Sequence, residues 1–307
     1  MKQTIASLFL LFLAGLGSNP GWSQESQVKL FALQVNSPAD EDDPHFAPSV
    51  NALLTSRFYF SRQEGKGKPV IMVSKWEKKA NKWGEAFTIG PYIDSKAGDA
   101  SCFVGEEGKF PQLIIYATRK DEKNSNFDLY KTFRDGPGKD REDKAFMPAR
   151  PLISLDTDED EMYPWLSKDQ MQIFFSRKGK DGWRLWTARR EAGSGVEGNF
   201  AEPNLLNEIP PGFHHVTMNP LGTLMFLQGP VENNRTGIFQ AKKTGAKWGD
   251  IKPVETLNHP EGKIGSKSPN LSRDGLRLYF ASDRPGGQGG LDLYSILVSD
   301  LKLTKTN

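Results

Sequence analysis

The chain has 307 residues, of which 37% are hydrophobic and 25% charged, and its net charge is +2 at pH 7. This composition is typical of a soluble globular protein and excludes a disordered chain. The 40 basic and 38 acidic residues are interspersed, so no basic face forms and no nucleic-acid partner is expected. Its 30 glycines, 20 prolines and 19 phenylalanines favour an all-β fold.

The N-terminus has the pattern of an export signal. Lys2 precedes a short apolar run over residues 5–16, which an Asn-Pro-Gly turn then ends. We therefore predict a signal peptide over residues 1–24 and a periplasmic or secreted location. No later run is long and apolar enough for an integral membrane segment. The single cysteine, Cys102, allows no internal disulfide, so the mature protein depends on its core for stability.

After the signal, the chain repeats one pattern five times. Each copy has an alternating or apolar strand, a turn rich in glycine or charge, and a further strand, and the last copy, 268–297, is the clearest. One aromatic residue marks the second strand of every copy, at spacings of 56, 59, 51 and 54 residues. These aromatic positions are Phe60, Tyr116, Phe175, Phe226 and Phe280. Such regular spacing indicates one structural unit that is repeated.

The repeats predict a β-propeller of about five four-stranded blades, within a single domain over 25–303 and followed by a tail at 304–307. The repeats cover about 43–94, 95–155, 156–209, 210–262 and 263–300. The last copy lacks an outer strand, and the segment 28–35 is the candidate to pair beside it and close the ring. A sixth blade would need a degenerate copy, and no region of sufficient length is left for one.

The last copy also carries a family resemblance. The runs Leu271-Ser-Arg-Asp-Gly, Leu278-Tyr-Phe-Ala-Ser-Asp-Arg-Pro-Gly-Gly and Leu291-Asp-Leu-Tyr resemble the WD40-like repeats of bacterial periplasmic propellers of the TolB type. The resemblance implies an exported propeller, commonly a binding module without catalysis. It does not extend to the separate N-terminal domain of the TolB type, for which this chain has no room.

Three residues of this repeat signature are expected to be structural. Asp283, Arg284 and Asp292 follow or precede the turn of the last copy. An Asp at a turn accepts backbone N–H bonds, and an Arg bridges carbonyl or carboxylate oxygens. We therefore expect these side chains to fasten turn to strand rather than to bind a ligand.

Propeller ligands usually lie over the central channel, where the loops that enter the inner strands converge. We expect those loops to hold a polar or cation-binding funnel, and the competing interpretation is that they are solvated loop residues. The candidates are Asp43, His45, Asp99, Asp160, Glu161, Tyr163, His214 and His215. The two adjacent histidines should point to opposite faces of one strand and therefore not share a metal.

The acidic run 156–160 has the alternating carboxylates of a calcium loop, at Asp156, Asp158 and Asp160. The sixth position is Glu161 where glycine is needed, and the twelfth is Ser167 where glutamate is needed. We therefore predict no metal or other cofactor, beyond a weak Ca²⁺ contact at these three aspartates.

Two functions compete at this level. The main hypothesis is a non-enzymatic binding or scaffold propeller, whose partner is another envelope protein, a peptide or a glycan; the sequence has no catalytic elbow and no phosphate loop. The alternative is a glycan-active hydrolase, in which Asp43, Asp99 and Glu161 converge from successive blades as the carboxylates that glycosidases need. An accessory propeller of a larger envelope complex is a third, minor hypothesis.

Overall fold

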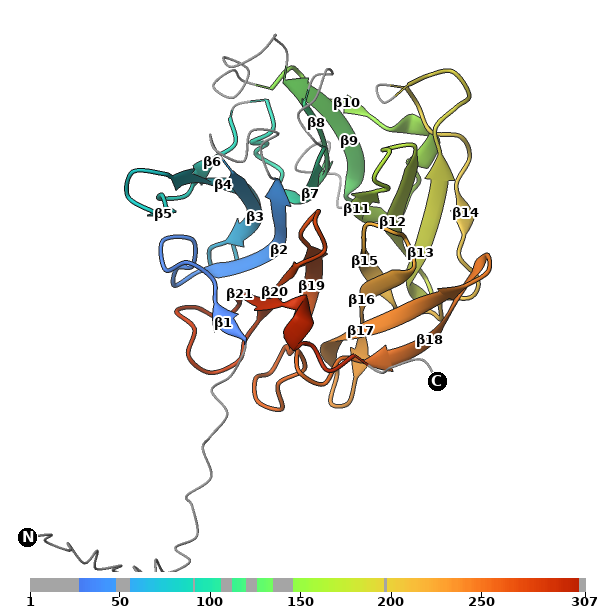
Figure 1. Ribbon diagram of the computed structural model, residues 1–307. Helices are drawn as coiled ribbons and strands as arrows, with labels where there is room; N and C mark the ends of the chain where they lie inside the picture. The colour runs from blue at the N-terminus through green and yellow to red at the C-terminus, as the bar shows by residue number, and fades with distance from the viewer. Residues whose placement is uncertain are drawn as a thin grey trace, which may run out of the picture.

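The computed structural model describes residues 28–47, 56–90, 92–105, 112–119, 126–134, 146–195 and 198–303. Its strands form five antiparallel sheets arranged around one axis, which confirms the predicted five-bladed propeller (Figure 1). The predicted signal peptide and the tail at 304–307 lie outside the described residues. No helix in the described part of the chain is long and apolar enough to cross a membrane.

Each blade runs from an inner strand at the axis to an outer strand at the rim. The inner strands are β2 (Asp40–Ala47), β7 (Asp99–Val104), β11 (Asp160–Leu166), β15 (His214–Met218) and β19 (Ser266–Leu271). The second strands are β3 (Arg57–Gln63), β8 (Gln112–Thr118), β12 (Gln172–Gly179), β16 (Leu224–Val231) and β20 (Arg277–Ser282).

The third strands are the hairpin partners of the second ones, and the outer strands are mostly short. The third strands are β4 (Val70–Glu77), β9 (Asp128–Arg134), β13 (Gly182–Arg189), β17 (Arg235–Thr244) and β21 (Asp292–Leu297). The outer strands are β5 (Lys82–Trp83), β6 (Phe87–Thr88), β10 (Arg150–Pro151), β14 (Asn204–Leu205), β18 (Lys247–Pro253) and β1 (Lys29–Leu30). Two short 3₁₀ helices, η2 (Ile153–Leu155) and η3 (Val298–Asp300), complete the described elements.

The core lies between the faces of neighbouring blades. Because each second strand is covered on both faces, its sequence is a continuous apolar run rather than an alternating one. All seven residues of β8 are buried, for example. Of the repeated aromatic positions, Phe60, Phe175, Phe226 and Phe280 are fully buried, and Tyr116 is 3% exposed. The aromatic spacing in the sequence therefore reflects the inter-blade core.

The ring closes through the N-terminal segment, as predicted. β1 pairs antiparallel with β21 and so becomes the outer strand of the last blade. The strand is shorter than the predicted 28–35, because the chain turns after Phe31 to enter β2. Asn36 holds this turn: its amide donates to the carbonyl of Phe31 at 2.5 Å and accepts from the N–H of Leu293 at 2.7 Å.

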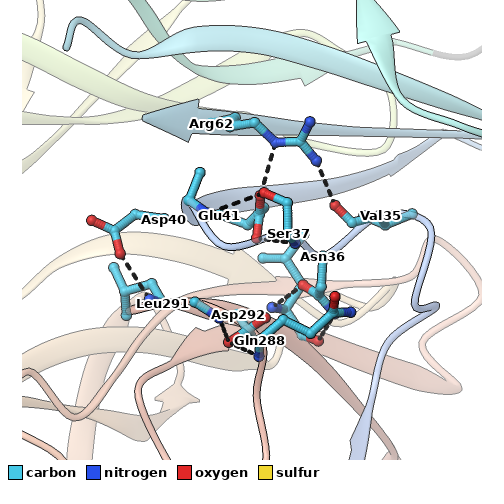
Figure 2. A network of polar contacts seen from close by, with 12 residues as sticks. Val35, Asn36, Ser37, Asp40, Glu41, Arg62, Gln288, Leu291 and Asp292 are labelled. Atoms are coloured by element: carbon cyan, nitrogen blue, oxygen red, sulfur yellow. Dashed lines mark hydrogen bonds and ion pairs between the residues drawn. The ribbon is translucent and has the colours of Figure 1, made fainter. Parts of the chain in front are cut away.

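Figure 2 shows how this closure joins the first blade to the last. Asp40 accepts the N–H of Leu291 at 2.9 Å, and Arg62 donates to the carbonyl of Val35 at 2.8 Å. The glycine run before β21 lets this segment approach the segment before β2 closely. A Cβ on Gly289 would lie 2.1 Å from the carbonyl oxygen of Ala39, so only glycine fits there.

Candidate functional site

Each inner strand carries a β-bulge at the same level of the channel. In all five, the pairing register shifts at or beside a non-glycine residue with a positive φ. These residues are Asp43 (φ 50°), Ser101 (42°), Tyr163 (58°), His215 (48°) and Ser268 (53°). Bulges re-aim side chains, and strained conformations of this kind gather at functional sites. We call these five residues the bulge ring.

Four N–H groups of the bulge ring, all but that of Asp43, donate to side chains of neighbouring blades. The N–H of Ser101 donates to Ser61 Oγ at 3.1 Å, and the N–H of His215 donates to Ser176 Oγ at 3.0 Å. The N–H of Ser268 donates to Gln228 Oε1 at 3.1 Å. Bulges leave a ladder N–H unpaired, and here the adjacent blade satisfies it, so the ring also ties the blades together.

Asp43 is the one carboxylate in the bulge ring. Ser61 and Ser268 donate to its two oxygens, at 3.1 Å and 3.2 Å, and His215 Nδ1 lies 3.5 Å from Oδ1. Burial, and then the neighbouring charge of Asp42, raise the pKa of Asp43 to about 7. Burial lowers the pKa of His215 to about 3, so at neutral pH the histidine is uncharged and the aspartate is partly protonated.

A partly buried ion pair lies beside Asp43. Lys267 Nζ is 2.5 Å from Asp42 Oδ2, and both side chains are 18% exposed. Burial disfavours the charged form of both side chains, but the attraction between them has the larger effect. Lys267 holds the pKa of Asp42 below its usual value, and Asp42, with Tyr163 and Asp43, raises the pKa of Lys267. Ser268 also donates to Asp42 Oδ1, at 2.5 Å. Asp42 is therefore a fixed anion next to the titrating Asp43.

Aromatic rings cover the opposite side of the channel mouth. Tyr163 stacks on His215 with ring centroids 4.4 Å apart and lies 5.5 Å from His214. Trp183, which is partly exposed, stacks on His214 at 5.0 Å. The two histidines were expected on opposite faces of the strand. The bulge at His215 instead brings both rings against Tyr163, because a residue with positive φ breaks the alternation of the strand.

The structure does not bring Asp99 and Glu161 to Asp43. Both lie two residues before the bulge of their strand, which is the position of Glu41 in the first blade. Glu161 binds Thr157 and accepts from Arg177 Nε at 2.7 Å.

Asp99 is held in a similar way. It accepts the N–H of Ser95 at 2.6 Å, and burial raises its pKa to about 6. Asp99 and Glu161 therefore tie the entering loop to the blade, and neither lies in the bulge ring.

The other predicted candidates also lie within strands rather than in loops. Asp160 accepts the N–H of Phe127 at 2.9 Å. His45 lies beyond the ring, where its Nε2 contacts the backbone N–H of Val104 at 3.0 Å and burial lowers its pKa to about 4. Asp160 and His45 thus connect neighbouring blades.

The acidic run does not form the predicted set of calcium ligands. Asp156 groups with Asp128 and Glu161, whose ligand atoms lie within 4.8 Å of one another. Both oxygens of Glu161 already accept hydrogen bonds, and the guanidinium of Arg177 occupies its side. A cation would be repelled there, so these residues do not fit a Ca²⁺ site, and Asp158 is exposed in the preceding loop.

The residues of the repeat signature bind backbone. Asp283 accepts the N–H groups of Lys263, Ile264 and Gly265, and Asp292 accepts those of Gln288 and Gly289. Arg284 donates to the carbonyl of Leu257 at 2.6 Å.

Sequence reasoning missed Lys267, Ser268, Ser61 and Trp183 as parts of the site. One signal could have found the ring: in three copies a proline directly follows the bulge residue, as in Asp43-Pro44. A proline inside an inner strand marks a bulge.

No family model matches the sequence, and the curated proteins give no match either. Many solved structures share the fold, and those most similar to it are mostly glycoside hydrolases. The GH43 endo-arabinanase from Bacillus licheniformis matches with a TM-score of 0.60 and 11% identity, over 85% of this chain and 94% of that chain. The catalytic domain of the GH62 α-L-arabinofuranosidase from Coprinopsis cinerea has a TM-score of 0.56 and 9% identity, over 86% and 92%.

TolB from Acinetobacter baumannii matches with a TM-score of 0.49 and 13% identity, over 86% of this chain and 55% of that chain. At these identities the matches show a common fold and no more. The chain therefore shares the all-β five-bladed propeller fold that these glycoside hydrolases have.

Proposed function

We propose that this protein binds a saccharide at the channel mouth. The observation that carries the proposal is the juxtaposition of an aromatic face, Tyr163 and Trp183, with the Asp42–Lys267 pair and the buried carboxyl of Asp43. Sugar rings stack on aromatic side chains with their apolar faces and hydrogen-bond charged groups with their hydroxyls. This proposal restricts the main hypothesis of a binding propeller to a glycan ligand. The structural neighbours, which are mostly glycoside hydrolases, support the alternative of a glycan-active hydrolase more than a propeller that only binds.

Hydrolysis of the glycan is the second candidate. A carboxyl with a pKa of about 7 suits a general acid at neutral pH. Glycosidases, however, use two carboxyl groups on opposite sides of the scissile bond. Asp42 and Asp43 are neighbours that share the hydroxyl of Ser268, and Asp42 is paired with Lys267. The channel mouth thus favours binding over turnover.

Calorimetric titration with a panel of oligosaccharides, including arabinan fragments, tests the proposal. We expect saturable binding to the wild type and at least a tenfold loss of affinity in Trp183→Ala, since a stacking surface is lost. Trp76→Ala is the matched control, because Trp76 is a partly exposed tryptophan of the first blade that packs on Trp83. Absence of binding across the panel would contradict the proposal. Release of reducing sugar by the wild type, lost in Asp43→Asn, would favour the hydrolase.

We also propose that the protein is exported and that its repeats are related to those of the TolB type. A bacterial periplasm or exterior would supply the glycan, and cleavage after about residue 24 would release the propeller. The mass of the protein recovered from a bacterial periplasm tests export, because retention of residues 1–24 would contradict it.

A further inference from the structure

A second concave site lies at the other end of the channel. A cavity of about 600 Å³ is lined by the carboxyl ends of the five inner strands and by the turns that follow them. All five inner strands begin at the face that carries the Asp42–Lys267 pair, so their carboxyl ends lie at the opposite face. The cavity therefore lies on the far side of the bulge ring, at the level of His45 and below it. Its volume is that of a typical small-molecule site.

The body of the cavity is aromatic. Phe46, Phe103, Trp165, Phe174 and Trp248 line it, and they come from four different blades. Trp165 and Phe174 meet edge to face, with centroids 5.8 Å apart. Aromatic walls on several sides suit a planar or alicyclic apolar body.

The uncharged polar side chains of the lining already have partners within the chain. Ser167 donates to Asp169 at 2.5 Å, and Ser272 donates to Asp274 at 2.6 Å. The side-chain Oδ1 of Asn219 accepts the N–H of Thr223 at 2.9 Å. A sugar would need new hydrogen bonds from such groups, so the lining disfavours a saccharide and favours an apolar ligand.

The charged residues of the lining are mostly cations. Lys168, Lys243 and Arg273 line the cavity, and Asp169 is the single carboxylate among the described lining residues. Asp169 is held by Ser167 and by the N–H of Met171 at 3.1 Å. Arg273, from the fifth blade, donates to the carbonyl of Lys168, in the third blade, at 3.2 Å. Arg273 and Lys168, two cationic residues of the lining, are therefore neighbours on one side of the aromatic cavity.

We propose that this cavity binds one small amphipathic molecule, with an apolar ring body against the aromatic walls and a single anionic group at Arg273 and Lys168. A carboxylate or sulfonate would accept charge-assisted hydrogen bonds there. The proposal concerns a different site from the channel mouth and does not depend on saccharide binding.

The test uses two fluorescent probes that share a fused aromatic body. 1-Anilinonaphthalene-8-sulfonate carries one sulfonate, and N-phenyl-1-naphthylamine is uncharged. Titration of the folded protein should show saturable binding of one sulfonate probe per chain, with higher affinity than the uncharged probe. Arg273→Gln should weaken binding of the sulfonate about tenfold and leave binding of the uncharged probe unchanged. Arg150→Gln, at an exposed arginine of the outer strand β10, is the matched control.

Lys168→Gln repeats the test at an exposed residue, so the answer does not depend on whether Arg273→Gln folds. The proposal is overturned if the wild type shows no saturable binding, or if both probes bind equally well. It is also overturned if Arg273→Gln and Lys168→Gln both behave like Arg150→Gln.

Discussion

At the residue scale, the chemistry of the channel depends on the unequal surroundings of two adjacent aspartates. Asp42 is neutralised by Lys267 and stays ionised. Asp43 is buried beside the negative charge of Asp42, so its proton is retained to higher pH, although hydrogen bonds from Ser61 and Ser268 act in the opposite direction. Burial and a like charge therefore separate the pKa values of neighbours that are identical in the sequence.

This separation predicts how stability changes with pH. The pKa of Asp43 is about 7 in the folded protein and near 3.8 unfolded, so the folded state binds more protons between these values. The contribution of Asp43 to the stability of the folded protein is fully present below pH 3.8 and is lost as the pH rises through 7. Asp43→Asn should therefore gain stability relative to the wild type from pH 5 to pH 8, on the order of 2–3 kcal/mol.

Urea denaturation followed by tryptophan fluorescence at pH 5 and pH 8 measures this change. Asp158→Asn, at an exposed loop aspartate, is the control and should show no pH-dependent difference from the wild type. An Asp43→Asn difference that stays constant with pH would show that Asp43 is ionised throughout this range.

At the scale of the element, the inner strands of the first three blades each have one position that anchors the entering loop and one that belongs to the bulge ring. The anchors of the first and third blades are equivalent: Glu41 accepts from Arg62 at 2.8 Å, and Glu161 accepts from Arg177 at 2.7 Å. Arg62 also donates to the carbonyl of Val35 at 2.8 Å, and Arg177 donates to the carbonyl of Leu155 at 3.0 Å. The Glu41 anchor is drawn in Figure 2. Carboxylates at these positions therefore stabilise the blade.

Removal of an anchor should destabilise the propeller. Glu161→Ala leaves Arg177 buried without its carboxylate, and the loss of one partner of a buried pair costs about 3–5 kcal/mol. Glu159→Ala, two residues earlier and partly exposed, should cost less than about 0.5 kcal/mol. Equal urea midpoints for the two variants would mean that the Glu161 anchor contributes nothing.

At the scale of the whole molecule, the ring is held by contacts between its two ends. Phe31, from the N-terminal segment, packs on Phe58 of the first blade at 4.2 Å and on Tyr279 of the last at 5.3 Å. The same segment supplies β1 to the last sheet. A propeller avoids a raw sheet edge by such closure, and the residues that make it lie at opposite ends of the sequence.

Truncation of the closing aromatic should lower the stability of the entire ring. Phe31→Ala removes a side chain that is 8% exposed, and buried phenylalanine truncations cost about 3–5 kcal/mol. Phe87→Ala, at a phenylalanine that is 45% exposed, is the matched control and should cost less than about 1 kcal/mol. Thermal unfolding by circular dichroism should show a single transition at lower temperature for Phe31→Ala. A separate early transition would show that the last blade unfolds independently.

Much of the architecture could be predicted from the sequence alone. The spacing of Phe60, Tyr116, Phe175, Phe226 and Phe280 indicated the number of blades, because each of these aromatics is buried in a second strand. Four of them face the preceding blade, whereas Phe226 faces the following one and Leu227 takes the equivalent position. The missing outer strand of the last copy determined that the N-terminal segment closes the ring. Both conclusions rest on local patterns that repeat along the chain.

The site was decided by the tertiary structure. Asp99 and Glu161 looked equivalent to Asp43 because all three are acidic residues near the start of an inner strand. The bulge places them two residues before the ring position, where Ser101 and Tyr163 stand instead. Lys267 reaches Asp42 from the far end of the chain. A one-residue bulge changes which side chain faces the channel, and the pKa of Asp43 depends on burial and on charges from other blades, so neither could be read from residue order.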